Sequence, residues 1–210
     1  MTAGVLGRVV VIGAGGHAKV VIEALRAAGF EPVGLVDKQA GAPALLGVRV
    51  LGDDDCLPGL RADGIEAAVV ALGANQARER AGQGLRALEF RLPAIIHPAA
   101  LVSPSARIRE GAVVMVRAVA GTLAEIGPLA ILNTGCIVEH DSRIGACAHV
   151  APGAALAGRV QVGERALVGV GASARPGVSI GADAVVGAGA AVVADVPAGA
   201  VVAGVPARQL

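Results

Sequence analysis

The sequence of 210 residues predicts two domains of different class, an N-terminal α/β domain with a parallel sheet and a C-terminal parallel β-helix. Two observations lead to this prediction. Short strand-like runs in the first part end in Gly, Asp or Asn and alternate with helical patterns, which is typical of βαβ units. From Val102 to Val192 an apolar residue occupies every sixth position, which indicates a repeat architecture. We place the domains at residues 1–94 and 95–210.

The α/β domain is predicted element by element. Residues 8–12 form a β-rich run, 13–17 a glycine turn, and 18–28 a helical pattern that ends at Gly29. Further strands are expected at 32–36 and 67–72, a helix at 76–88, and a last strand at 90–96. In open parallel sheets the carboxyl ends of the strands form the edge where ligands usually bind. We therefore expect a ligand near residues 13–17, Asp37 and 73–75.

The glycine turn has two interpretations. Backbone N–H groups of Gly15 and Gly16 could bind a phosphate at the start of the helix, while Asp37 could accept hydrogen bonds from ribose hydroxyls. Alternatively, the glycines only allow a tight connection from strand to helix. His17 stands where a GxGxxG motif requires a third small residue, so a nucleotide fits this turn better than a redox dinucleotide.

The second half of the chain has a period of six residues. Sixteen consecutive apolar positions follow this frame, and a small residue such as Ala124, Ala130 or Cys136 lies four places after most of them. A period of six fits neither a helix nor a simple strand. It fits a triangular coil of three hexads, with successive turns stacked about 4.8 Å apart. Seven glycines directly follow the apolar residue, which indicates a backbone bend or a close approach between coils.

Composition excludes several classes of protein. A net charge of +1 and the absence of Trp and Tyr argue against nucleic-acid binding. Apolar stretches are interrupted well before the roughly 18 residues that span a bilayer, so no membrane insertion is expected, and the start of the chain reads as a strand rather than a signal peptide. Cys56, Cys136 and Cys147 lack a CxxC pattern, which favours a cytoplasmic location and a packing role for Cys136.

His140 is the strongest candidate for chemistry in the repeat. The frame turns Val138 and Ser142 inward and leaves His140 on the outer face. A solvated surface histidine would satisfy the same pattern. An imidazole with a pKa of about 6.5 is, however, able to accept a proton at neutral pH.

The whole chain resembles the hexapeptide-repeat acyltransferases of the sialic-acid O-acetyltransferase-like group, which includes the N-acetyltransferases of UDP-linked 4-amino sugars. The resemblance is carried by residues 11–19 (VIGAGGHAK), 35–37 (LVD), 71–75 (ALGAN), 95–100 (IIHPAA), 132–141 (LNTGCIVEHD) and 201–208 (VVAGVPAR). It implies a Rossmann-like domain that binds a nucleotide sugar, followed by a left-handed parallel β-helix. It also implies acetyl-CoA as co-substrate, no metal, and a homotrimer with active sites at the subunit interfaces.

The resemblance assigns roles in the β-helix. His140 would be the general base, supported by Asp141, although the family often has the longer Glu there and Glu139 is an alternative. His149 would contact acetyl-CoA, or serve as a polar residue at a subunit interface. Val170 and Ala188 would contact coenzyme A through backbone groups. Gly158 is a candidate donor to the oxyanion.

In the first domain the resemblance assigns the glycine turn to the substrate. The nucleotide sugar would contact Gly15, Gly16, His17, Asp37, Gly73 and Asn75. His97 is expected to have a structural role, and the outward residues Val119, Ile131 and Ile137 are expected to form the trimer contact.

The predicted function is acetyl-CoA-dependent N-acetylation of a nucleotide-linked amino sugar in bacterial glycan biosynthesis, by direct transfer. Three alternatives remain open: a sugar O-acetyltransferase of the sialic-acid type, a zinc-dependent carbonic-anhydrase-like β-helix, and a non-catalytic nucleotide-sugar sensor. The zinc site would need three histidines, and the coils offer only His140 and His149, with His97 at their edge. The sequence does not encode the identity of the sugar, its nucleotide or the acyl group.

Overall fold

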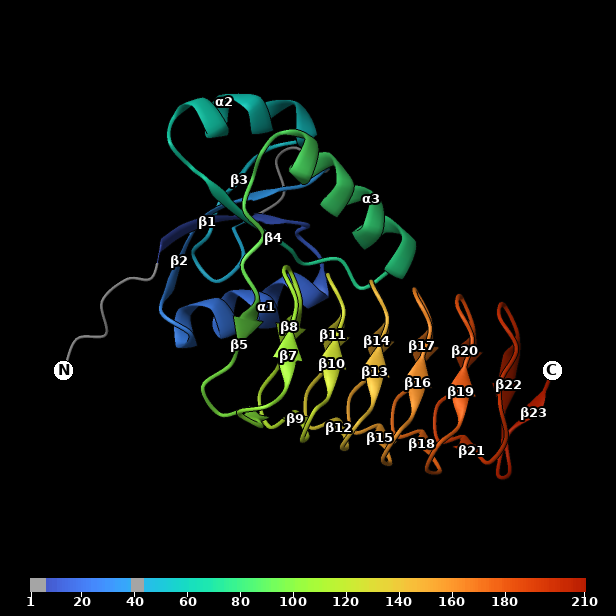
Figure 1. The fold of residues 1–210 in the computed structure, drawn as a ribbon. Helices are drawn as coiled ribbons and strands as arrows, with labels where there is room; N and C mark the ends of the chain where they lie inside the picture. Colours follow the sequence, from blue (N-terminus) through green and yellow to red (C-terminus); the bar gives the residue numbers. More distant parts are fainter. Residues whose placement is uncertain (1–6, 39–43) are drawn as a thin grey trace. The chain divides into compact units, whose positions relative to one another are not determined.

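A computed structural model describes residues 7–38 and 44–210 (Figure 1). The chain divides into two compact units, Met1–His97 and Pro98–Leu210. The predicted strand at the start of the chain lies partly outside the described residues. Within the described ranges, no helix has the length and apolar character needed to cross a membrane.

The first unit contains a parallel sheet with strand order β3-β2-β1-β4. Its strands are β1 (Gly7–Ile12), β2 (Phe30–Val36), β3 (Val50–Gly52) and β4 (Ala67–Val70). Its helices are α1 (Gly16–Ala27), the short 3-10 helix η1 (Asp54–Cys56), α2 (Leu57–Ala62) and α3 (Asn75–Ala87). Because the order reverses at β1, which pairs with both β2 and β4, the carboxyl ends of these strands form the crevice typical of nucleotide-binding folds.

The predicted helices and the strands β1, β2 and β4 are confirmed to within about two residues at most ends. The sequence patterns did not indicate β3, η1 and α2, which are short and lie among Gly, Asp and Pro residues. The predicted strand over 90–96 is wrong in extent. Arg91 forms a single bridge to Ala67, and β5 covers only Ile95–Ile96. Pro93 lies between them and lacks the N–H that a continuous ladder needs.

The second unit is a three-sided parallel β-helix (Figure 1). From β6 to β21 the paired strands lie eighteen residues apart, as Glu125 of β10 pairs with Arg143 of β13, whereas in the last coil Val185 of β20 pairs with Val201 of β22, sixteen residues later. The first side contains β8 (Val113–Val114), β11 (Ile131–Leu132), β14 (His149–Val150), β17 (Leu167–Val168), β20 (Val185–Val186) and β22 (Val201–Ala203), and β23 (Arg208–Gln209) pairs antiparallel to β22. The second side contains β6 (Leu101–Val102), β9 (Val119–Ala120), β12 (Ile137–Val138), β15 (Ala155–Leu156), β18 (Ser173–Ala174) and β21 (Ala191–Val192). The third side contains β7 (Arg107–Ile108), β10 (Glu125–Ile126), β13 (Arg143–Ile144), β16 (Gln161–Val162) and β19 (Ser179–Ile180).

The interior of the prism follows the six-residue frame. The repeat residues Ile126, Leu132 and Val138 are fully buried, and so are residues at the small-residue position of the hexad, including Cys136 and Ser142. Ser142 is the polar exception, and its hydroxyl donates to the carbonyl of Ala157 (3.2 Å) and accepts from the N–H of Val160 (3.1 Å). The buried hydroxyl is therefore satisfied by the next coil.

The repeat glycines allow the coils to approach one another. A Cβ on Gly145 would lie 2.6 Å from the backbone nitrogen of Glu164 in the next coil. The left-handed residue of each corner lies two positions further on and is often not glycine, as at Leu123 (φ 58°), Asp141 (φ 58°) and Arg165 (φ 56°). Close approach, rather than a bend, is thus the reason for glycine directly after the apolar residue.

The three sides differ in their outward side chains. The second side presents Leu101, Val119, Ile137 and Ala155, whereas the third side presents Arg107, Glu125, Arg143, Gln161 and Ser179. On the first side, Val113 and Ile131 are already fully buried within one chain, while His149 and Leu167 are half-buried. The prediction that Ile131 offers an accessible outward surface is therefore wrong. Val119 and Ile137 remain partly exposed.

Candidate active site

His140 lies at the corner that follows β12, on the outside of the prism. Its Nδ1 is 2.8 Å from a carboxylate oxygen of Asp141, and both side chains are about half exposed. Because a carboxylate is only an acceptor, Nδ1 carries the proton in the neutral ring and Nε2 is left with a lone pair. The shorter aspartate therefore reaches the ring. The left-handed conformation of Asp141 turns its backbone at the corner, where its N–H donates to the carbonyl of Thr122 (2.9 Å).

Gly158 lies one coil after His140, directly beside the imidazole. The two coils are joined by a hydrogen bond from the N–H of Arg159 to the carbonyl of His140 (2.9 Å). A Cβ on Gly158 would collide with Nε2 of His140 and would lie 2.5 Å from its Cε1. The predicted base and the predicted oxyanion donor are thus neighbours in space.

The other residues predicted to contact the cofactor follow a different side of the prism. His149 lies in β14 on the first side, and its Nε2 is 3.0 Å from the side-chain nitrogen of Asn133. Val170 and Ala188, both exposed, follow β17 and β20 of that same side, one coil apart. One chain therefore aligns His149, Val170 and Ala188 along one side and holds His140 at a corner beyond the next side.

In the α/β domain, the glycine turn joins β1 to α1. Gly13 has φ 104°, and a Cβ there would lie 2.7 Å from the side chain of Leu72, so the turn requires glycine at this position. Asp37, at the end of β2, accepts a hydrogen bond from the N–H of Ala14 (2.7 Å). Gly15 is the N-cap of α1, and Gly15 and Gly16 are exposed with open space around them. The backbone at the start of α1 is accessible to a ligand.

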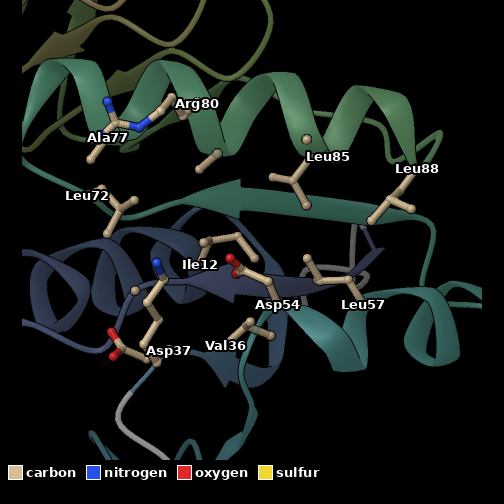
Figure 2. Close-up of a pocket in the computed structure, with 14 residues that line it drawn as sticks. Ile12, Val36, Asp37, Asp54, Leu57, Leu72, Ala77, Arg80, Leu85 and Leu88 are labelled. Atoms are coloured by element: carbon tan, nitrogen blue, oxygen red, sulfur yellow. The ribbon is translucent and has the colours of Figure 1, made fainter.

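A cavity of about 560 Å³ opens beside this turn. Figure 2 shows its labelled residues, with Ala77, Arg80 and Leu85 of α3 and the C-cap residue Leu88 on one wall and Ile12, Asp54 and Leu57 facing them. Asp37 and Lys38 belong to its lining, whereas the predicted contacts Gly15, Gly16, His17, Gly73 and Asn75 do not. Sequence reasoning missed Asp54 and Leu57, because they lie in η1 and α2, for which no pattern was seen. The cavity combines apolar walls with both signs of charge.

Arg78 of α3 is almost completely buried, at 1% exposure. Its guanidinium donates to the carbonyls of Leu72 (2.9 Å) and Gly73 (3.0 Å) and to the side-chain oxygen of Asn75 (2.8 Å). These bonds hold the loop between β4 and α3 in place. Burial, with the nearby Arg78 charge, also holds the pKa of His17 below its ordinary value. Both causes favour the neutral form of His17.

None of the three cysteines forms a disulfide. Burial raises the pKa of Cys136 to about 12, so this thiol is unreactive and fills the small-residue position of its hexad. In the described ranges, no group of three His, Cys, Asp or Glu side chains is arranged to hold a metal ion. His97 is half-buried in the described structure.

The comparisons with known proteins match both domains. Residues 8–85 match the family described as PglD N-terminal domain. A histidine-to-asparagine variant of perosamine N-acetyltransferase from Caulobacter crescentus, solved with CoA and GDP-perosamine, is 50% identical, covers 98% of this chain and 97% of its own, and superimposes with a TM-score of 0.95.

Two further solved structures cover nearly all of this chain. The acetyltransferase domain of PglB from Neisseria gonorrhoeae FA1090, in complex with acetyl coenzyme A, is 38% identical, with coverage of 97% and 98% and a TM-score of 0.92. WeeI from Acinetobacter baumannii AYE is 26% identical, with coverage of 97% and 100% and a TM-score of 0.83. These matches confirm the predicted Rossmann-like domain and left-handed parallel β-helix. The chain belongs to the hexapeptide-repeat family of sugar N-acetyltransferases.

Proposed function

We propose that this protein transfers the acetyl group of acetyl-CoA to the amine of a nucleotide-linked amino sugar in bacterial glycan biosynthesis, with His140 as the general base. The observation that carries the proposal is the His140–Asp141 pair on the outer corner of the β-helix. Family membership supplies the class of reaction, since the relatives are N-acetyltransferases solved with CoA, acetyl-CoA or an amino-sugar nucleotide.

The geometry of the pair supports direct transfer. Asp141 fixes the proton of His140 on Nδ1, so Nε2 can accept a proton from the sugar amine as its nitrogen attacks the thioester carbonyl. The carboxylate also stabilises the imidazolium that forms. Collapse of the tetrahedral intermediate breaks the C–S bond and releases CoA. A backbone N–H, with Gly158 as our candidate, donates to the oxyanion.

We place the nucleotide part of the substrate in the cavity of the α/β domain. The accessible N–H groups at Gly15 and Gly16 and the positive end of α1 suit a diphosphate. His17 next to them, and Gly73 and Asn75 on the loop held by Arg78, border the same strand ends. Asp37, which accepts from the N–H of Ala14, also lines the cavity and is our candidate acceptor for a ribose or base donor.

We propose a homotrimer because one chain divides the site between sides of the prism. His140 lies at a corner of the apolar second side, whereas His149, Val170 and Ala188 follow the first side. A three-fold arrangement that packs the second side of one protomer against the first side of the next would bring these residues together and leave the polar third side in water. Acetyl-CoA would then lie in the groove between protomers. The use of acetyl-CoA as co-substrate and the absence of disulfides among the three cysteines support a cytoplasmic location for this enzyme.

The decisive experiment measures CoA release by the wild-type protein with acetyl-CoA and a panel of GDP-, UDP- and dTDP-linked 4-amino sugars, alongside the matching hydroxyl sugars. We expect turnover with an amino sugar, and a loss in kcat of about 100-fold or more for His140→Ala. Turnover only with hydroxyl sugars would establish the O-acetyltransferase alternative. An unchanged kcat in His140→Ala would contradict the base assignment.

The trimer has its own test. Val119→Asp together with Ile137→Asp places charges on the second side, and light scattering should then report monomers with low activity. Charge changes on the third side, such as Gln161→Lys, serve as the matched control and should leave the trimer intact. A trimer that survives the paired substitution would contradict the proposed packing.

A further inference from the structure

Gly158 has no backbone reason to be glycine. Its φ is not among the left-handed values found at the corners. The same corner position carries Thr122 two coils before it and Pro176 one coil after it, so the turn accepts other residues. Unlike Gly145, whose missing Cβ makes room for backbone of the next coil, Gly158 makes room for a side chain. That side chain is the imidazole of His140.

The space at Gly158 matches the face of the ring near Nε2. A Cβ would collide with Nε2 and would lie 2.5 Å from Cε1 and 3.0 Å from Cδ2. The edge of the same ring is bound at Nδ1 by Asp141 at 2.8 Å. The imidazole is therefore limited at one edge by a carboxylate and on one face by the bare Cα of Gly158, which lies close to Nε2.

We propose that Gly158 is a positioning residue for the acetyl transfer, because its missing side chain provides the space that holds the His140 imidazole with Nε2 toward the substrate amine. This inference rests on the proposed role of His140 as the base. It adds a specific requirement at position 158, where even a single methyl group displaces the ring. Asp141 orients the proton, and Gly158 sets where the lone pair lies.

The nature of the obstructed atoms predicts that the fold survives this change. At Gly158 a methyl group meets the end of a surface side chain that can rotate away, whereas at Gly145 it meets backbone. The ring can move only by lengthening the bond to Asp141 or by turning Nε2 away from the groove. Either movement weakens the base without removing it, because catalysis depends on placement to within a fraction of an ångström.

The test is a double-mutant cycle with Gly158→Ala, His140→Ala and the double variant, in the intact trimer. We expect Gly158→Ala to lower kcat by about 10- to 100-fold, part of the usual contribution of a general base, with KM for both substrates changed less than about two-fold. In the His140→Ala background the same change should have no further effect on kcat. Pro176→Ala, at the same corner position one coil on, is the matched control and should keep the wild-type kcat.

Two outcomes would overturn the proposal. One is a wild-type kcat in Gly158→Ala. The other is an equal loss of kcat in the presence and absence of His140, which would mean that Gly158 acts on the thioester and not through the ring.

A measurement without turnover separates this inference from the proposed function. In ¹⁵N NMR spectra, wild-type His140 should appear as the Nδ1–H tautomer, and Gly158→Ala should shift its tautomer ratio while Pro176→Ala does not. An unchanged His140 spectrum in Gly158→Ala would refute the positioning role. If the spectrum changes but His140→Ala keeps full activity, Gly158 does position the His140 ring, and only the assignment of His140 as the general base fails.

Discussion

In the β-helix, the position of a residue in its hexad determines its surroundings: Val138 and Ser142 are buried, and His140 between them is exposed. In the α/β domain, the comparable groups come from unrelated positions. Asp37 follows β2, Asp54 begins η1, and Arg78 lies in the first turns of α3. The β-helix therefore spreads its stability over many equivalent contacts, whereas the α/β domain depends on a few unique ones. The difference should be visible when single residues are replaced.

The largest effect is expected at Arg78 in the α/β domain. Arg78→Gln removes the buried guanidinium that donates to the carbonyls of Leu72 and Gly73, and should destabilise this domain by about 2–5 kcal/mol. KM for the nucleotide sugar should rise, while KM for acetyl-CoA stays near the wild-type value. Arg80→Gln, at an exposed position of the same helix, is the control for stability alone, because Arg80 also lines the cavity; it should leave stability unchanged. Calorimetry and steady-state kinetics check both, and equal stability losses would contradict the unique role of Arg78.

A pair of glycines compares the two domains directly. Gly145→Ala forces a methyl group against the backbone of the next coil and should destabilise the β-helix by about 1–3 kcal/mol. Gly84→Ala, in exposed open space within α3, should stabilise the α/β domain by about 0.5–1 kcal/mol. Thermal unfolding of both variants shows whether each substitution lowers or raises the stability of its domain. An increase in stability in both variants would show that the coils can move apart to accept the methyl group.

A smaller effect concerns pH. Because the pKa of His17 is lowered in the folded state, the unfolded chain takes up a proton more readily as the pH falls below about 6.5. This contribution to stability is present above pH 6.5 and decreases as the pH falls toward the folded pKa, by less than about 1.4 kcal/mol per pH unit. Urea unfolding from pH 7.5 to 5.5 should show a weaker decline in His17→Gln than in wild type. Parallel declines would contradict the assignment to His17.

The smallest expected effect is the absence of a reaction at a cysteine in the β-helix. Cys136 should not react with iodoacetamide in the folded protein, because its pKa of about 12 and full burial keep the thiolate absent. Half-buried Cys56 should react slowly, since burial and Asp53 raise its pKa as well. Mass spectrometry with and without denaturant compares the two. Fast labelling of native Cys136 would indicate that the coils open.

The sequence alone predicts much of this architecture because periodic patterns report local geometry. The hexad frame correctly placed the interior residues and the exposed corner of His140. It did not show that Ile131 is enclosed, since a hexad position reports only whether a side chain points into or out of the prism. Nor could it decide between Glu139 and Asp141 as the partner of His140, because both are adjacent and only the corner conformation directs one carboxylate to the ring. Asp54 was missed because it lies in η1, a short element for which no pattern was seen.

The eighteen-residue spacing of the paired strands from β6 to β21 also limits how the protein can change in length. Removing one hexad upstream of His140 would rotate the remainder of the prism by a third of a turn and carry the imidazole to another face. Removing a whole turn would leave each remaining residue on the same side of the prism and would shorten the solenoid by one strand spacing, about 4.8 Å. Insertions and deletions in this protein are therefore tolerated in multiples of eighteen, or at the far end of the coils, where no reacting group depends on their phase.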